Sequence, residues 1–288
     1  MTTLAMVANL TPLHAAGRIA WRQGQAASGQ RVLAEETPVA FTYNRTTYAV
    51  MLATPADLED FAVGFSLTEG VIDEPSEILA LAVLEVRDGI ELRMDLTPER
   101  MTGLEARRRR LAGFGGCGLC GMESLAQVLR PLPARRGGAV AGWRIDSATL
   151  AEGMAALPAL QVLNRQAHAL HAAAFMRPLD GIVAVAEDVG RHNALDKLAG
   201  YLARRGIKAG DGALLLSSRV SVELVQKAAR IGAPLLAGVS APTALALRVA
   251  DAAGITVVGI ARADGFEVFT HAGRVLGAQA DAIGTAIS

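Results

Sequence analysis

The stretch Ala213-Leu214-Leu215-Leu216-Ser217-Ser218-Arg219-Val220-Ser221 decides the architecture of the second half of this chain. A short apolar run, typical of a buried strand, is followed by polar residues and then by a helical pattern that runs to Ile231. The same alternation recurs, with further strands predicted at Val183–Ala186, Leu235–Ala237 and Ile255–Ile260, and helices at Asn193–Arg204 and Pro242–Ala253. Alternating strands and helices predict a largely parallel sheet covered on both faces.

The first half has a different pattern. Two β-rich runs within Pro38–Leu52 flank Asn44-Arg45, and Leu79–Val86 and Ile90–Leu96 flank Asp88-Gly89, so each pair predicts a hairpin. Thr54-Pro55 predicts an N-cap followed by proline at the first helical position. We therefore expect an α/β protein, α+β overall, with an irregular lead-in over residues 1–30, a smaller N-terminal domain of hairpins and helices over 31–140, and a C-terminal α/β domain over 141–288.

Composition limits the class of protein. Lys plus Arg equals Asp plus Glu, at 28 each, so no global field attracts nucleic acid or an anionic membrane. No apolar run approaches the roughly 20 residues of a membrane helix, and the N-terminus has no export-signal pattern. Only two cysteines are present, which favours a reducing compartment. We expect a cytoplasmic protein that binds neither nucleic acid nor membrane.

Both cysteines lie in the loop Gly115-Gly116-Cys117-Gly118-Leu119-Cys120-Gly121. The glycines leave the thiols accessible, and the preceding run of arginines, residues 107–110, favours a thiolate. The pair fits a redox dithiol, a persulfide carrier, or half of a zinc site completed by His168 and His171. An inert surface pair is the remaining reading, and the residues alone leave all four open.

A second polar cluster follows the first strand of the second half. The run Glu187–Lys197 brings Asp188, Arg191 and His192 into one strand-to-helix turn, where open α/β sheets bind ligands. The plain alternative is a surface pair of Asp188 with Arg191 and an N-cap at Asn193. We favour a functional turn because so many polar groups are unusual there.

Two further strand-to-helix turns carry hydroxyls. Ser217, Ser218, Arg219 and Ser221 occupy one, and the stretch Ser240–Thr243 occupies the next. Hydroxyls and free amides at a helix N-terminus suit phosphate, although ordinary N-capping by Ser221 or Ser240 explains either turn alone. The chain has no Walker A motif and no GxGxxG, so the sequence predicts a phosphorylated ligand without the signatures of ATP hydrolysis or dinucleotide redox chemistry.

Taken together, these segments resemble the FdhD family of formate dehydrogenase accessory sulfurtransferases. The resemblance spans about residues 33–275 and includes, among others, Glu35–Pro38, Thr54–Asp57, the Cys117–Gly121 loop, Glu187–Lys197, Ser218–Ser221, Val225–Ala229, Ser240–Thr243 and Thr270-His271. Composition alone makes Arg262–Gly265 a hairpin turn and His171 a structural residue before a strand at Ala172–Phe175.

The resemblance implies a function. Such a protein takes sulfur from a cysteine desulfurase as a persulfide, which maps to Cys117 with Cys120 assisting. It passes the sulfur to the bis-molybdopterin guanine dinucleotide molybdenum cofactor for formate dehydrogenase. It also implies a homodimer and a C-terminal fold like that of the cytidine deaminases, whose zinc signature is absent here.

The resemblance and the polar turns together predict a cofactor site that a GDP-like nucleotide would mimic, with no resident metal. Its predicted members are His171, Asp188, Arg191, His192, Ser217, Ser218, Arg219, Ser221, Ser240, Thr243, Ile260, Ala261, Arg262, Ala263, Asp264 and Gly265. Two other classes remain as alternatives: a guanine-nucleotide-binding chaperone that never handles sulfur, and a zinc-dependent hydrolase using Cys117, Cys120 and His171.

Overall fold

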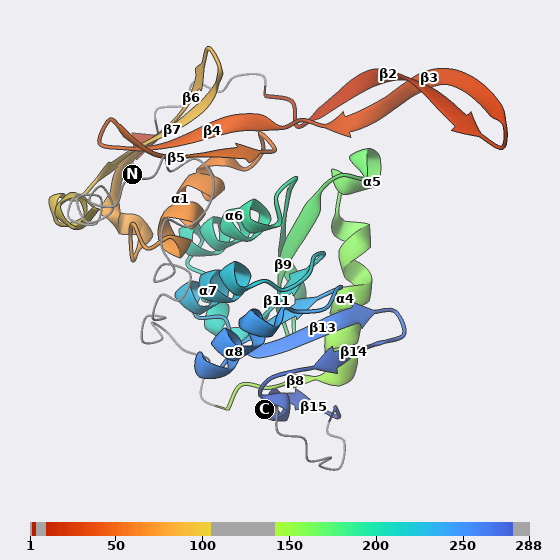
Figure 1. Cartoon of the computed structure of the whole chain (residues 1–288). Helices are drawn as coiled ribbons and strands as arrows, with labels where there is room; N and C mark the ends of the chain where they lie inside the picture. Colours follow the sequence, from red (N-terminus) through yellow and green to blue (C-terminus); the bar gives the residue numbers. More distant parts are fainter. Residues whose placement is uncertain (1, 4–9, 105–141, 279–288) are drawn as a thin grey trace.

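The computed structural model describes residues 2–3, 10–104 and 142–278 and has a mixed α/β architecture (Figure 1). The cysteine loop and the predicted boundary near residue 140 lie outside the described residues. Within the described part, no helix is both long and apolar enough to cross a membrane.

The N-terminal sheet is built from the two predicted hairpins. The strands are β1 (Thr2–Thr3), β4 (Thr37–Tyr43), β5 (Thr46–Ala53), β6 (Ile78–Val86) and β7 (Gly89–Leu96), in the order β1-β6-β7-β4-β5. Helix α1 (Leu58–Thr68) covers one face, where Phe41 stacks on Phe65 with ring centroids 3.9 Å apart. Both hairpins are confirmed, and Asn44 and Arg45 take the positive φ values that the tight turn requires.

The second sheet has the order β10-β9-β11-β12-β13-β14. Its strands are β9 (His171–Arg177), β10 (Gly181–Asp188), β11 (Ala213–Leu216), β12 (Leu235–Gly238), β13 (Thr256–Arg262) and β14 (Gly265–Val268). Only the neighbours β11–β12 and β12–β13 pair in parallel, and β10 points the same way but is separated from them by β9, so the prediction of a largely parallel sheet is wrong. The sheet is mixed because β9 forms an antiparallel hairpin with β10 and also lies antiparallel beside β11.

Helices cover both faces of this sheet, as the alternation predicts. Alanines and leucines of α6 (Arg191–Arg204), α7 (Val222–Ile231) and α8 (Ala244–Ala252) pack on one face. Helix α4 (Ser147–Leu160), which the sequence pattern did not reveal, packs Leu150, Met154 and Leu157 on the other. The remaining elements are short: η1 (Pro75–Glu77), α5 (Asn164–Ala167), η2 (Ala209–Asp211), η3 (Ala272–Arg274), and the parallel pair β8 (Ile145–Asp146) and β15 (Val275–Leu276).

Two local predictions require correction. Residues within the predicted lead-in form β2 (Leu13–Arg22) and β3 (Gln25–Ala34), a regular antiparallel hairpin that projects from the body. Thr54 does not cap α1, because the helix begins later and its N-cap position is Asp57, in a left-handed conformation. Residues 98–104 are helical.

The two halves meet along α1 and α6, which cross at a pair of glycines. A Cβ on Gly64 would overlap the carbonyl oxygen of Asp196, and a Cβ on Gly200 would overlap that of Asp60. Glycine at both positions therefore lets the two helix backbones touch. This contact fixes the position of α6, whose first residues belong to the candidate site.

Candidate functional site

The predicted site residues gather along one edge of the second sheet. Strands β11, β12 and β13 are parallel neighbours, so their carboxyl ends lie side by side and the turns that follow them meet. The antiparallel register of β9 brings His171 to the same edge, opposite Asp188 and beside the end of β11. Topology thus places together residues that the sequence separates by more than ninety positions.

Several contacts tie these turns to one another. The amide of Thr243 donates to the carbonyl of Val220 at 3.0 Å, and the amide of Ile260 donates to the carbonyl of Ser240 at 3.3 Å. Arg262 Nε donates to the carbonyl of Val239 at 3.3 Å. The segment 260–265, predicted from the resemblance, therefore lies directly beside the turn that carries Ser240. Residues Ala263 and Asp264 form the turn between β13 and β14, as predicted.

Two histidines and two serines face one another at this edge. Ser217 Oγ lies 3.5 Å from His171 Nδ1 and accepts a hydrogen bond from the amide of Ala172 at 2.7 Å. Ser221 Oγ lies 3.4 Å from Nε2 of His192. Burial, and secondarily the charge of Arg191, lowers the pKa of His171, and the same two causes lower that of His192 to about 4. Both imidazoles are therefore neutral near pH 7.

Arginines supply the positive charge of this edge. Arg219 is exposed on the turn after β11, and Arg191 begins α6. The buried Nε of Arg191 has no hydrogen-bond partner among the described residues. A buried donor without a partner is costly unless a ligand or water satisfies it. The arrangement of two arginines, hydroxyls and helix N-termini is suited to an anion such as phosphate.

The hydroxyl groups of the two turns make different hydrogen bonds. Ser221 occupies the N-cap position of α7 but makes no side-chain capping bond, whereas Thr243 caps α8 by accepting from the amide of Ala246 at 3.3 Å. Ser218 Oγ donates to the carbonyl of Arg219 at 3.0 Å. The N-cap of α8 is therefore Thr243 and not Ser240. Glu223, whose carboxylate lies 3.8 Å from His192 Nε2, is a neighbour of the site that the sequence reasoning missed.

Asp188 faces inward, away from this edge. It is fully buried and forms an ion pair with Lys197 at 2.7 Å, so the alternative surface pair with Arg191 is not formed. Asp188 also accepts hydrogen bonds from the amides of Thr54 and Gly190 and from Asn193 Nδ2, while the N-cap of α6 is Gly190. The carboxylate is thus saturated by protein donors, and its role in the structure is to join the two halves.

A second buried ion pair lies further along α6. Asp196 accepts from Lys227 Nζ at 2.9 Å and from Thr68 Oγ1 at 2.5 Å, and Lys227 also lies 3.2 Å from Glu69. Burial lowers the pKa of Lys227, but the neighbouring carboxylates of Asp196 and Glu69 outweigh this and raise it. These contacts again link α1 to α6 and α7.

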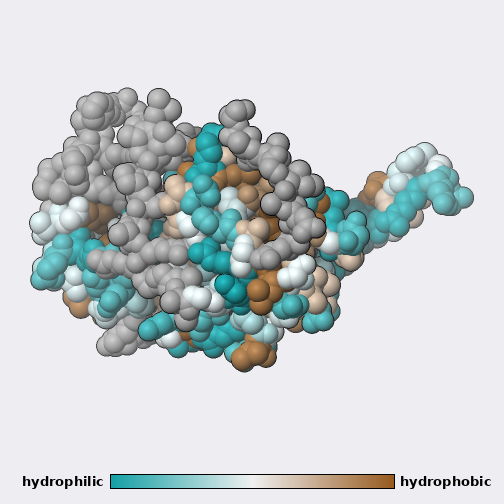
Figure 2. All heavy atoms as spheres, turned by 90° about the horizontal axis from the view of Figure 1, so that it is seen from below, coloured by the Kyte–Doolittle hydropathy of each residue, from teal (hydrophilic) through white to brown (hydrophobic). Residues whose placement is uncertain are grey.

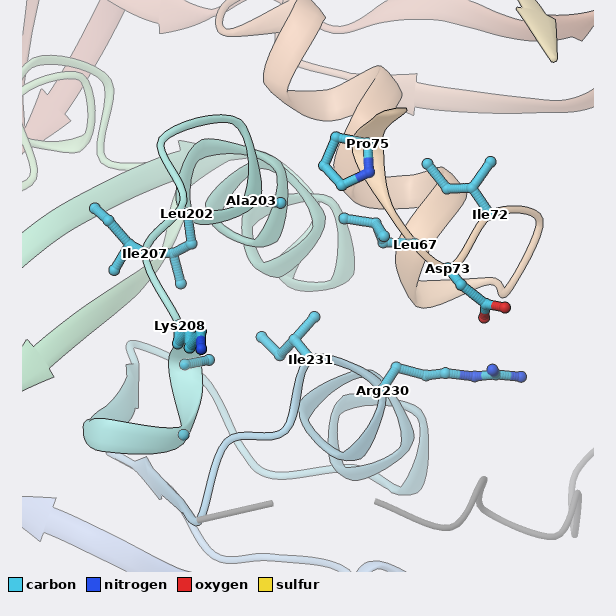
Figure 3. Close-up of a pocket in the computed structure, with 12 residues that line it drawn as sticks. Leu67, Ile72, Asp73, Pro75, Leu202, Ala203, Ile207, Lys208, Arg230 and Ile231 are labelled. Carbon is cyan, nitrogen blue, oxygen red and sulfur yellow. The ribbon is translucent and has the colours of Figure 1, made fainter. Parts of the chain in front are cut away.

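A pocket of about 300 Å³ lies between the halves but contains none of the predicted site residues (Figure 3). Leu67, Ile72 and Pro75 line one side, and Leu202, Ile207 and Ile231 line the other, with Asp73, Lys208 and Arg230 among its polar residues. Its mostly apolar lining belongs to the α1–α6–α7 junction. Among the described residues, no group of three His, Cys, Asp or Glu side chains is placed to hold a metal ion.

Comparisons with known proteins agree on one family. Residues 34–276 match the FdhD/NarQ family. The sulfur carrier protein FdhD of Agrobacterium fabrum is 50% identical over 259 residues, covering 90% of this chain and 94% of that protein. The FdhD of Brucella melitensis is 48% identical, and the match covers 90% of this chain and 95% of that protein.

A solved structure shares the fold. It is a crystal structure from Desulfotalea psychrophila, described as a formate dehydrogenase accessory protein. The two sequences are 24% identical, and the match covers 92% of this chain and 100% of that one, with a TM-score of 0.69.

Proposed function

The chain belongs to the FdhD/NarQ family, and from this premise we propose that it is a sulfur carrier required for formate dehydrogenase activity. In this proposal Cys117 accepts sulfur as a persulfide from a cysteine desulfurase. Cys120 assists its transfer to the bis-molybdopterin guanine dinucleotide cofactor, which is the substrate. The observation that carries the proposal is the gathering of Arg191, with its unpartnered Nε, Arg219 and the serine turns at one sheet edge, on a chain with a single CxxC pair.

The chemistry requires a thiolate acceptor and a place to hold the cofactor. Attack of the Cys117 thiolate on the sulfur of a desulfurase persulfide forms the new S–S bond and releases the desulfurase thiolate. The cofactor carries guanosine phosphates, and the serine turns offer hydroxyls, helix N-termini and arginines of the kind that bind phosphate. We propose that a homodimer presents one such edge to each guanosine end of the cofactor. The likeness to cytidine deaminases remains a prediction.

Intact-mass measurement after incubation with a cysteine desulfurase and cysteine tests the carrier step. We expect the wild type and Cys120→Ala to gain one sulfur, and Cys117→Ala to gain none and to leave formate dehydrogenase inactive in cells that lack the wild type. Cys120→Ala is the matched control, because it removes the other thiol of the same loop. Restoration of activity by Cys117→Ala would contradict the proposal and favour a chaperone that shelters the cofactor without handling sulfur.

Calorimetric titration with GDP tests the cofactor edge separately. Arg219→Ala should weaken GDP binding if its guanidinium meets phosphate, and the cysteine variants should bind GDP as the wild type does. Equal affinity for every nucleotide, or none, would remove the guanosine site while leaving the sulfur step intact. Stoichiometric zinc in the purified protein would instead favour the hydrolase.

A further inference from the structure

Strand β14 is the edge strand of the second sheet (Figure 1), and an aromatic ring is exposed at its end. Phe269 directly follows the strand and is 37% exposed, whereas Phe175 on β9 of the same sheet is fully buried. In the view of Figure 2, the described hydrophobic residues form small separate groups among hydrophilic ones. A single exposed ring among polar groups suits a small planar ligand better than it suits a protein surface.

A glycine in the neighbouring strand holds this ring beside the candidate site. A Cβ on Gly259 would lie 3.0 Å from Phe269 Cε2 and 3.3 Å from the carbonyl oxygen of Ser240. It would also lie 2.7 Å from Pro242 Cδ. The absence of a side chain at Gly259 thus lets the ring pack over the backbone of β13. The ring therefore lies next to the turn Ser240–Thr243, which leads into α8.

The backbone that follows Gly259 is strained. Ile260 has a φ of 50°, in the left-handed region that β-branched residues rarely adopt, and the pairing of β13 with β14 shifts between Gly259 and Arg262. The hydrogen bond from the amide of Ile260 to the carbonyl of Ser240 holds this conformation. Strained positions of this kind cluster where proteins hold ligands, so the strain and the exposed ring point to the same place.

A carboxylate lies on the same face of the sheet as the ring. Glu267 pairs directly with Gly259, and Phe269 follows two residues later, so both side chains are on the face where a Cβ of Gly259 would stand. The alternate pair, Val258 with Val268, faces the core under α4. Glu267 is exposed and forms no ion pair with the residues that the structure describes. Its carboxylate is therefore available to accept hydrogen bonds from the edge of a base stacked on Phe269.

We infer that Phe269 stacks on the guanine base of the bound cofactor and that Glu267 selects guanine, while the phosphates reach the turn Ser240–Thr243. The N1–H and the exocyclic amine of guanine both donate hydrogen bonds, and one carboxylate accepts both. Adenine presents a lone pair at N1, which a carboxylate repels. The assignment rests on the proposed function, because it names the part of the same sheet edge that recognises the base.

Calorimetric titration of the full chain with GDP, inosine diphosphate, ADP and pyrophosphate tests the stacking role. We expect Phe269→Ala to bind all three nucleotides roughly tenfold or more weakly, because the stacking contact is lost, and to bind pyrophosphate as the wild type does. Phe269→Tyr should bind GDP as the wild type does, since a tyrosine ring also stacks. Leu179→Ala is the matched control, because Leu179 is 98% exposed in the turn between β9 and β10.

Glu267→Gln tests the selection of the base. The wild type should bind GDP more tightly than inosine diphosphate, which lacks the exocyclic amine, and ADP most weakly. In Glu267→Gln we expect the preference for GDP over ADP to fall roughly tenfold, because the charged acceptor of both guanine donors is gone. Glu85→Gln is the matched control, since it removes an exposed carboxylate from β6 in the other sheet.

Each role can fail by itself. Wild-type affinity for GDP in Phe269→Ala overturns the stacking role, and an unchanged preference for GDP in Glu267→Gln overturns the selective role. Either result leaves the sulfur carrier and its phosphate site standing. A wild type that binds no nucleotide removes the guanosine site together with this inference. Sulfur loading, measured by intact mass, is a separate readout, so failure of the carrier step is distinguishable from failure of the base site.

Discussion

At the scale of single residues, different side chains of the candidate site supply positive charge and neutral hydrogen-bonding groups. His192 is held near Ser221 and Glu223 with its pKa lowered to about 4, so near pH 7 it acts as a neutral donor or acceptor. Positive charge comes from the guanidinium groups of Arg191 and Arg219. An anion at this edge would therefore be held by the arginines and by neutral hydrogen-bonding groups.

The lowered pKa of His192 predicts acid sensitivity of the fold. Its pKa is below the unfolded value of about 6.5, so its contribution to stability is complete above that pH and is lost as pH falls toward 4. We expect His192→Gln to reduce the loss of melting temperature between pH 7 and pH 4.5 by about 2–4 °C, which corresponds to roughly 1 kcal/mol. Thermal unfolding at both pH values checks this. An unchanged acid-side slope would show that His192 is not the group that titrates.

At the scale of elements, α1 and α6 cross with their backbones in contact at Gly64 and Gly200. An added methyl at either position meets backbone atoms of the other helix, which cannot move aside as a side chain can. We expect Gly64→Ala and Gly200→Ala each to lower the free energy of unfolding by about 1–3 kcal/mol or more. Gly17→Ala is the control, because nothing lies within 4 Å of the added methyl there. Denaturant unfolding measures all three, and a neutral Gly64→Ala would contradict the observed helix contact.

Elements with a strong local sequence signal could be predicted, and elements without one could not. Apolar runs such as Ala213–Leu216 predicted the central strands, and Asn44-Arg45 predicted a hairpin, because both signals are local. The hairpin β2–β3 was missed because its strands are rich in Ala, Gly and Gln, which have low β-propensity. The insertion of β9 beside β11 depends on pairing between distant segments, and no local pattern encodes it.

The candidate site could also be predicted only where the sequence signal was local. Strand ends predicted that Ser217 and Ser240 lie at one edge, because parallel neighbours end together, whereas Arg262 was assigned to the site from the family resemblance. The inward direction of Asp188 depends on Lys197 and on Thr54 from the other half, and a sequence window around the turn contains no sign of that third partner.

At the scale of the whole molecule, buried charges join the two halves. Lys197 Nζ pairs with Asp188 and also donates to the carbonyl of Thr54 at 2.8 Å, while Asp188 accepts from the amide of Thr54 at 3.0 Å. One ion pair in the C-terminal half therefore satisfies both backbone groups of a single residue in the N-terminal half. Because α6 also begins the candidate site, the junction between the halves holds that site in place.

The final prediction concerns this junction. Lys197→Met leaves the buried carboxylate of Asp188 without its cation, which typically costs roughly 3–5 kcal/mol. The double variant Asp188→Asn with Lys197→Met removes both charges, so it should lose less stability than Lys197→Met alone. Calorimetry measures the stability of both variants. A double variant less stable than the single one would mean that the Asp188 carboxylate stabilises the fold through its amide donors even without Lys197.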